Sequence, residues 1–294
     1  MRLPAGLQEL LDEAVIDEVV RQLKSGKEAS VYSVRCGAEI RCAKVYKDMA
    51  QRSFKQRAQY QEGRKTRGSR DARAMAKSTR HGRKEMENAW KNAEVDALYQ
   101  LTAAGVRVPR PFGFYNGVLI MEMVTDADGD CAPRLGEVEL SPEVARDYHS
   151  FLIRQIVLML VSGLIHGDLS QFNVLIGEQG PVIIDLPQVV NAAGNNGAFA
   201  MLERDVNNIT DTLGQFAPEL RETNFALEMW ALFEQGELKP DSALTGFPPK
   251  VEVAVNLEEV VLAIDDARRE EMFRREREKA AQGPSDNAPH DLAV

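Results

Sequence analysis

The sequence predicts an α+β protein with a mostly β N-terminal half and a helical C-terminal half. Runs of strand-forming residues flank a Cys36-Gly37 turn and an Asn116-Gly117 turn, and Asn-Gly is among the strongest hairpin signals. From Ser141 onward the apolar residues recur at helical spacing instead. Apolar residues make up 44% of the 294 residues and charged residues 28%, as in ordinary globular proteins with a sizeable core.

The chain shows no sign of a membrane span or a secretion signal. It contains no run of 18 apolar residues, and its N-terminus is acidic and amphipathic. We therefore expect a cytoplasmic protein that does not contact a membrane. Cys36, Cys42 and Cys131 lack metal-ligand spacing and are odd in number, which predicts free thiols.

The strongest functional signal is the stretch from Leu164 to Gln188. Two short apolar strands, Val174–Ile176 and Pro181–Ile184, are joined by a Gly-Glu-Gln-Gly turn and predict a hairpin. Such a hairpin brings three flanking polar groups to one end, which is hard to explain by isolated turn residues. These groups are Asp168, Asn173 and Asp185.

The three polar groups have the types and spacing that phosphoryl transfer needs. One carboxylate accepts the proton of the nucleophile, while an amide and a second carboxylate hold Mg²⁺ against the phosphates of ATP. Asp168 is the candidate catalytic base, and Asn173 and Asp185 are the candidate metal ligands. A single Asp in a turn more often caps that turn. His166 is expected to orient the loop, because no other His or Cys lies near it in sequence.

Lys44 is the candidate phosphate-binding lysine. By the two-residue period of a strand it shares a face with Cys42 and Tyr46. A lysine there can reach the α- and β-phosphates and needs an acidic partner. The predicted helix Glu85–Leu101 offers Glu94, with Glu87 as the competitor. Cys42 would then lie above the adenine.

The segment before this strand is a candidate phosphate loop. Residues Leu7–Leu23 predict an amphipathic helix that ends at Ser25 and Gly26, and strands are expected at Val31–Val34 and Ile40–Val45. A glycine-led loop at the head of this hairpin can place backbone N–H groups over phosphates. The candidate nucleotide-binding residues are Ser25, Gly26, Lys27, Glu28, Ala29, Ser30 and Val31.

A second hairpin leads to a candidate hinge. Its strands are expected at Phe112–Tyr115 and Val118–Met123, after which the chain turns polar. In a protein of two lobes the hinge would fall at this point, and its backbone groups would form hydrogen bonds with the edge of the adenine. The candidate hinge residues are Met121, Glu122 and Met123.

Helices are expected to follow on both sides of the central motif. Ser141 and Pro142 predict the start of a long buried helix, and further helices are expected at Ala198–Phe216 and Asn224–Phe233. About a dozen residues separate Asp185 from the next helix, which leaves no room for a long mobile loop.

Charge is distributed unevenly along the chain. Residues 51–84 carry twelve Arg or Lys against Glu62 and Asp71, a net charge of +10, which leaves −19 for the rest of a chain with net charge −9. A basic segment on an acidic body is typical of contact with a phosphate backbone. A solvated loop is the alternative.

Several motifs together resemble the RIO family of atypical serine/threonine protein kinases. They are SGKEASVY, CAKVYK, the basic insert, HGDLSQFN and IIDLPQ, from about Val20 to about Leu220. The resemblance implies a two-lobed protein-kinase-like fold without an extended activation loop. It implies Lys44 paired with Glu94, Asp168 as catalytic residue, and Asn173 and Asp185 on Mg²⁺. It also implies an ATPase switch that autophosphorylates at Asp185 and acts in maturation of the small ribosomal subunit.

We expect four segments along the chain. They are an N-terminal helical extension (1–19), an N-lobe (20–122) with the basic insert 51–84, a C-lobe (123–235), and a C-terminal appendage (236–294) with a charged helix and a disordered tail.

Two alternative functions remain. One is a small-molecule phosphotransferase of the aminoglycoside or choline type, against which the basic insert argues. The other is a nucleotide-gated factor that binds RNA or the ribosome, with catalysis serving release.

Overall fold

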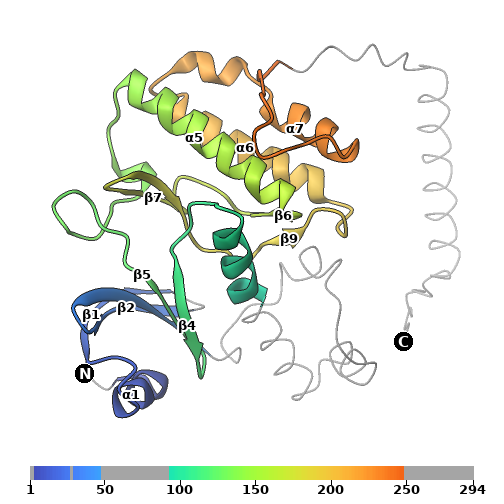
Figure 1. The fold of residues 1–294 in the computed structure, drawn as a ribbon. Coiled ribbons are helices and arrows are strands. Elements are labelled where there is room, and N and C mark those ends of the chain that lie inside the picture. Colours follow the sequence, from blue (N-terminus) through green and yellow to red (C-terminus); the bar gives the residue numbers. More distant parts are fainter. Residues whose placement is uncertain (1–2, 27–28, 48–92, 248–294) are drawn as a thin grey trace, which may run out of the picture. The chain divides into compact units, whose positions relative to one another are not determined.

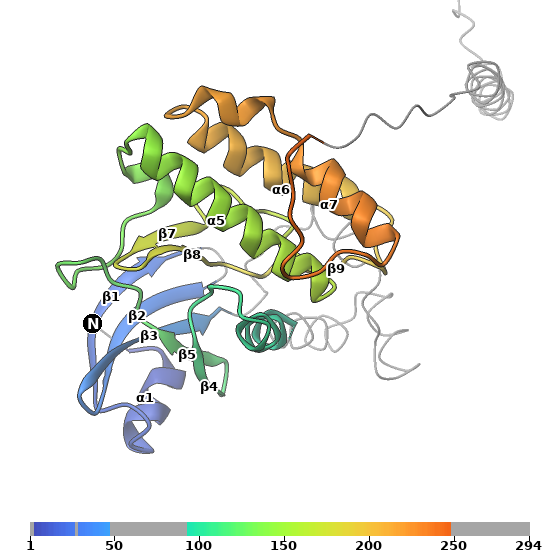
Figure 2. The same ribbon diagram turned by 45° about the horizontal axis from the view of Figure 1, so that its top comes forward.

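The N-terminal half of the chain forms a five-stranded antiparallel sheet. The computed structural model describes residues 3–26, 29–47 and 93–247. Figure 2 shows the strands side by side in the order β1-β2-β3-β5-β4. Both predicted hairpins are confirmed, with Gly37 and Gly117 at positive φ in their turns. The strands are β1 (Glu18–Ser25), β2 (Ala29–Cys36), β3 (Glu39–Tyr46), β4 (Pro111–Tyr115) and β5 (Val118–Glu122).

The predicted helix Leu7–Leu23 is wrong beyond its first half. Helix α1 covers only Ala5–Asp12, Ala14 takes a positive φ of 54°, and the chain then enters β1. The register of β1 against β2 shifts between Val19 and Arg21 and again between Gln22 and Lys24. Such irregularities interrupt the alternation of apolar and polar residues that identifies a strand. The apolar residues of this segment recur at the spacing of a helix instead, and the sequence therefore predicted one.

Helix α1 covers one face of this sheet. Leu7 and Leu10 are fully buried, and they form a hydrophobic cluster with sheet residues. Figure 1 shows α1 beside the strands that carry those residues. The sheet residues of the cluster are Tyr32, Val34, Ala43, Val118 and Ile120.

The C-terminal half is built on long helices with short strand pairs beside them. Ser141 caps the first helix by accepting a hydrogen bond from the Val144 amide at 3.3 Å, and Pro142 occupies the first turn as the sequence predicts. Residues 93–103 are also helical. The named elements are α5 (Pro142–Val161), β6 (Leu164–Ile165), β7 (Val174–Gly177), β8 (Gly180–Ile183), β9 (Val190–Asn191), α6 (Ala198–Leu213), α7 (Phe225–Glu234), and the 3₁₀ helices η2 (Leu135–Glu137) and η3 (Pro218–Glu222).

The two-lobed α+β prediction is confirmed by this division into a sheet and a helical part. Helix α6 ends at Leu213, three residues before the predicted Phe216, and α7 begins one residue after its predicted start, with Asn224 as its cap. The segment between Asp185 and Ala198 is short, as predicted. Among the described residues no helix has the length and apolarity to cross a membrane.

Some sequence predictions lie outside the described residues. They concern the basic insert 51–84, the first part of the helix expected at Glu85–Leu101, and the charged helix and tail of the C-terminal appendage. The segment boundaries at 19, 122 and 235 stay predictions.

The packing of α1 on the sheet predicts a large effect for Leu10→Ala. Leu10 has 0% exposure, so truncation opens a cavity and should lower the free energy of unfolding by about 2–4 kcal/mol. Leu227→Ala is a matched control, because Leu227 is 44% exposed on α7 and should cost less than about 1 kcal/mol. Denaturant unfolding followed by circular dichroism measures both. Equal losses would contradict the packing of α1.

Candidate active site

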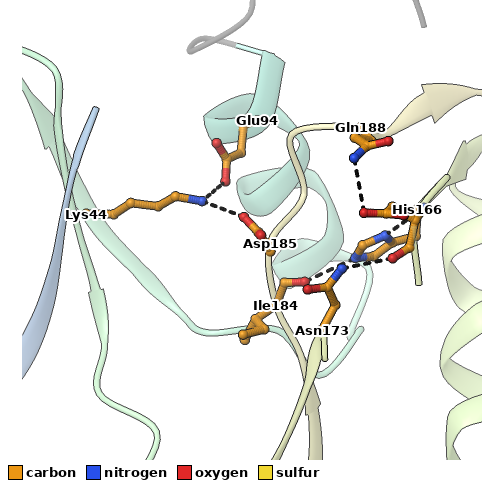
Figure 3. Close-up of polar contacts among 8 residues, drawn as sticks. Lys44, Glu94, His166, Asn173, Ile184, Asp185 and Gln188 are labelled. Carbon is orange, nitrogen blue, oxygen red and sulfur yellow. Dashed lines mark hydrogen bonds and ion pairs between the residues drawn. The ribbon is translucent and has the colours of Figure 1, made fainter. Parts of the chain in front are cut away.

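Lys44 joins three elements of the structure at one point. Its Nζ atom lies 2.5 Å from Oε1 of Glu94 and 2.9 Å from Oδ1 of Asp185. Figure 3 shows the lysine side chain pointing from β3 toward both carboxylates, one from the helix at 93–103 and one just after β8. The predicted Lys44–Glu94 pair is therefore present, while Glu87 lies outside the described residues.

Burial and charge act in opposite directions on this cluster. Burial alone would lower the pKa of Lys44, but the charges of Glu94 and Asp185 outweigh it and raise that pKa. Burial would likewise raise the pKa of Asp185, yet Lys44 outweighs it and the pKa is lowered. Burial, together with the charge of Glu94, raises the pKa of the Tyr46 hydroxyl. Lys44 is thus charged, Asp185 is ionised and the phenol of Tyr46 is neutral.

The backbone at Asp185 is held in an uncommon conformation. Its φ is 66°, in the left-handed region that Asp visits more readily than most residues. The preceding residue fixes this turn, because the Ile184 amide donates to the Asn173 carbonyl at 2.9 Å and the Ile184 carbonyl accepts from His166 Nε2 at 3.1 Å. Strained backbone that its surroundings over-determine is typical of functional sites.

His166 organises the loop that carries Asp168. Nδ1 of the ring accepts from the Asp168 amide at 3.3 Å, so Nε2 carries the proton and donates to Ile184. Asn173 closes the loop from the other side, with Nδ2 donating to the Asp168 carbonyl at 2.8 Å. His166 therefore links the two predicted aspartates through backbone contacts, in agreement with the orienting role expected from the sequence.

The donor atoms suit a magnesium ion that is also held by phosphates. Nδ2 of Asn173 is engaged by the loop and Oδ1 of Asp185 by Lys44, which leaves one oxygen on each side chain for a cation. In the part of the chain that the structure describes, no three His, Cys, Asp or Glu side chains converge to hold a metal by themselves. Mg²⁺ commonly uses one or two carboxylates plus phosphates and waters, so the residues present fit it.

Helix α6 anchors the Asp168 loop with residues that the sequence analysis missed. Asp205 is 1% exposed and accepts from the amides of Gly167 at 2.7 Å and Leu169 at 2.8 Å. Arg204 donates to the Gly167 carbonyl, and Asn208 donates to the Leu169 carbonyl at 2.8 Å. The sequence held one signal for this role, because Asp205 falls at a buried position of an amphipathic helix, where a carboxylate needs hydrogen-bond partners.

Asp168 itself has an environment suited to a base. Burial raises the pKa of its carboxyl, His166 and Arg204 partly offset the rise, and Asp185 adds a smaller contribution to it. A raised pKa makes a carboxylate a better proton acceptor. One of its oxygens, Oδ2, accepts from Nε2 of Gln188 at 3.0 Å.

The candidate phosphate loop connects strands β1 and β2, whereas the sequence predicted a helix before the loop. Ser25 ends β1, and its hydroxyl lies 3.3 Å from that of Ser30 in β2. Lys47, which the sequence analysis did not select, donates to the Gly26 carbonyl at 2.7 Å and to Ser25 Oγ at 3.0 Å. Residues 27–28 lie outside the described part of the chain.

The residues proposed to surround the adenine come from three neighbouring strands. Val31 of β2 lies opposite Lys44 of β3, and Cys42 of β3 lies opposite Met121 of β5. Ala29 begins β2 and is buried. Burial raises the pKa of the Cys42 thiol to about 12, so the thiol is neutral and suits an apolar contact.

The candidate hinge has a polar network that the sequence did not reveal. Arg107 holds the Glu122 carboxylate with both Nη atoms, at 2.6 and 2.9 Å, and the Arg110 amide adds a third bond at 3.1 Å. The Arg107 amide in turn donates to Oε1 of Gln155 in α5 at 2.7 Å. Met123 follows directly after β5. The hinge is therefore tied to the C-terminal half by side chains.

This architecture defines a class before any comparison with known proteins. A sheet carrying a lysine paired to a helix glutamate, opposite a loop and a hairpin that bear Asp, Asn and Asp, is the two-lobed arrangement of the protein kinase class. A solved kinase-domain structure aligns over 74% of this chain and 67% of its own, with a TM-score of 0.47 and 12% identity.

The chain belongs to the RIO family. The family model described as RIO domain matches residues 30–225. A relative named RIO-type serine/threonine-protein kinase Rio1, from Haloferax volcanii, is 33% identical over 213 residues, which cover 70% of this chain and 67% of that protein. Serine/threonine-protein kinase RIO1 from Homo sapiens is 30% identical over 207 residues, which cover 70% of this chain but only 35% of the human protein.

The Glu122 network predicts how stability changes with pH. The folded-state pKa of Glu122 is lowered below the usual 4.5, because the hydrogen bonds and charge of Arg107 outweigh burial. Its contribution to stability is therefore fully present above about pH 4.5 and is lost as the pH falls through the lower, folded-state value. Glu122→Gln should cost about 1 kcal/mol at pH 7 and less at pH 3.

Urea denaturation at the two pH values measures this difference. Glu237→Gln is a matched control, because Glu237 is exposed and makes no ion pair among the described residues. An equal cost of Glu122→Gln at both pH values would contradict the prediction.

Proposed function

We propose that the chain is an ATP- and Mg²⁺-dependent serine/threonine protein kinase of the RIO type. The observation that supports this most directly is Lys44 held between Glu94 and Asp185, opposite the loop that carries Asp168 and Asn173. Family membership favours protein substrates over the aminoglycoside or choline alternative. We also propose that the protein acts in the cytoplasm.

The side chains would divide the work of the reaction. A serine or threonine hydroxyl forms the new O–P bond with the γ-phosphorus of ATP, the bond to ADP breaks, and Asp168 takes the hydroxyl proton. Lys44 binds the α- and β-phosphates, and Glu94 keeps its ammonium aimed at them. Asn173 and Asp185 would hold Mg²⁺, which would neutralise phosphate charge when bound.

We also propose autophosphorylation at Asp185. An oxygen of its carboxylate would form the O–P bond, ADP would leave, and water would later release phosphate, which amounts to ATPase activity. The charge of Lys44 lowers the pKa of Asp185, so the side chain is ionised and can act as a nucleophile.

The basic insert supports a second role in binding an RNA-rich partner such as the small ribosomal subunit. Its net charge of +10 over residues 51–84 contrasts with −19 elsewhere. Such a segment gains affinity by releasing counterions from a phosphate backbone. Binding and release of the partner would then follow the nucleotide state of the active site.

Asp168→Ala should lower ATP turnover at least about a thousandfold, because the proton acceptor is lost, and should leave ATP binding within about threefold. Phosphate release and fluorescent-nucleotide titration measure the two effects. Asp147→Ala, at an exposed position of α5, is the matched control and should match the unsubstituted chain. Full turnover by Asp168→Ala would remove the proposed mechanism.

Neutralising four cations of the insert to Gln should weaken binding to purified small ribosomal subunits and flatten its salt dependence. The loss of about three or more phosphate contacts lowers the slope of log K against log salt by a similar number. The four residues are Arg64, Lys65, Arg67 and Arg70.

A control set removes the same charge from the described surface. It replaces Arg35, Arg146, Arg221 and Lys239 with Gln. Filter binding from low to moderate salt compares the sets, and the control should keep the original slope. An unchanged slope for the insert variant would rule out its docking role.

A further inference from the structure

We propose that Gln188 is a positioning residue that fixes the orientation of the Asp168 carboxylate. This inference rests on the proposed phosphoryl transfer and adds a residue that the spacing of Asp, Asn and Asp does not include. Nε2 of Gln188 donates a hydrogen bond of 3.0 Å to Oδ2 of Asp168. Figure 3 shows the amide of Gln188 directed at that loop, on the side away from Lys44.

The fold fixes where Gln188 lies relative to Asp168. Strands β6 and β9 pair with Ile165 opposite Val190. Asp168 comes three residues after the first partner, and Gln188 comes two residues before the second. The β6–β9 ladder therefore holds both residues at the same end of one short two-stranded sheet.

Buried neighbours restrict the backbone on both sides of Gln188. Leu186 is 3% exposed, Val189 is 7% exposed, and the Val189 amide donates to the Leu186 carbonyl at 3.2 Å in a tight turn. Val190, the next residue, is 2% exposed. The amide of Gln188 is thus presented from a packed turn, which limits the freedom of its donor atom.

The chemistry of an amide suits this position better than a charged group. A carboxylate accepts hydrogen bonds on both oxygens, and a donor on Oδ2 leaves Oδ1 of Asp168 for the hydroxyl of the nucleophile. The bond also prevents the carboxylate from rotating out of line, and small misplacements of this kind are costly in catalysis. Gln188 adds no net charge beside Arg204 and Asp185, whose charges already act on Asp168.

Two substitutions of nearly the same size test this role. Gln188→Met keeps the length of the side chain and removes the donor. Gln188→Glu keeps the shape even more closely, but it places an acceptor and a negative charge against Oδ2. If Gln188 acted only by packing, Glu would be the milder change.

We expect the opposite order in the rate of turnover. Gln188→Met should lower kcat roughly tenfold, which corresponds to a lost hydrogen bond to a charged group, and Gln188→Glu should lower it further. ATP affinity, measured directly with a fluorescent nucleotide, should stay within about threefold for Gln188→Met because Asp168 is not a nucleotide-binding group.

Gln100→Met is the matched control for loss of a glutamine-donated bond. Gln100 Nε2 donates to the Ser162 carbonyl at 2.7 Å, outside the candidate active site. This variant should keep the original kcat. Thermal unfolding of all the variants shows whether any of them loses structure.

The outcomes separate failure of this inference from failure of the proposed function. If the unsubstituted chain turns over ATP and Gln188→Met keeps its kcat, or if Glu is milder than Met, the positioning role is wrong while the proposed function stands. If the unsubstituted chain neither binds nor turns over ATP, the proposed function is wrong and the role of Gln188 falls with it.

Discussion

The candidate site depends on the ammonium of Lys44 and the two carboxylates that hold it. Desolvating a charge in a protein costs several kcal/mol, and this lysine is only 12% exposed. The carboxylate of Glu94, which is 5% exposed, offsets this desolvation from a buried position. Asp185 is 50% exposed, so its carboxylate can also contact a ligand. Because removing either carboxylate would leave the ammonium undercompensated, the sheet, the helix at 93–103 and the end of β8 are constrained together.

A second set of buried polar contacts places the Asp168 loop within the same frame. The loop contains a buried histidine, and its backbone N–H groups point at Asp205 from a helix more than thirty residues later in the chain. Burial raises the pKa of Asp205, because removing a carboxylate from water disfavours its ionised form. The hydrogen bonds that Asp205 accepts hold the backbone of the loop from the side of α6, and Asn173 holds it from the other side.

Local sequence patterns predicted the parts of the site that are close together along the chain. Asp168, Asn173 and Asp185 lie on one hairpin and its flanks, so their convergence followed from strand geometry. The contacts of Asp205, Gln188 and Arg107 depend on tertiary packing, which no local period reports. Strand β1 was missed for another reason, because its register shifts removed the alternation while Val15, Val19 and Leu23 kept a helical spacing.

The β6–β9 pairing has a consequence for how such a site can be switched. Each strand of the pair has two residues, and the segment that links Asp185 to β9 is packed against the core at Leu186 and Val189. A change in how this segment packs would therefore move Gln188, and with it the hydrogen bond that Gln188 donates to the Asp168 carboxylate. Under the proposed function, nucleotide or a partner that binds at this site would switch it by favouring one packing of this segment over another.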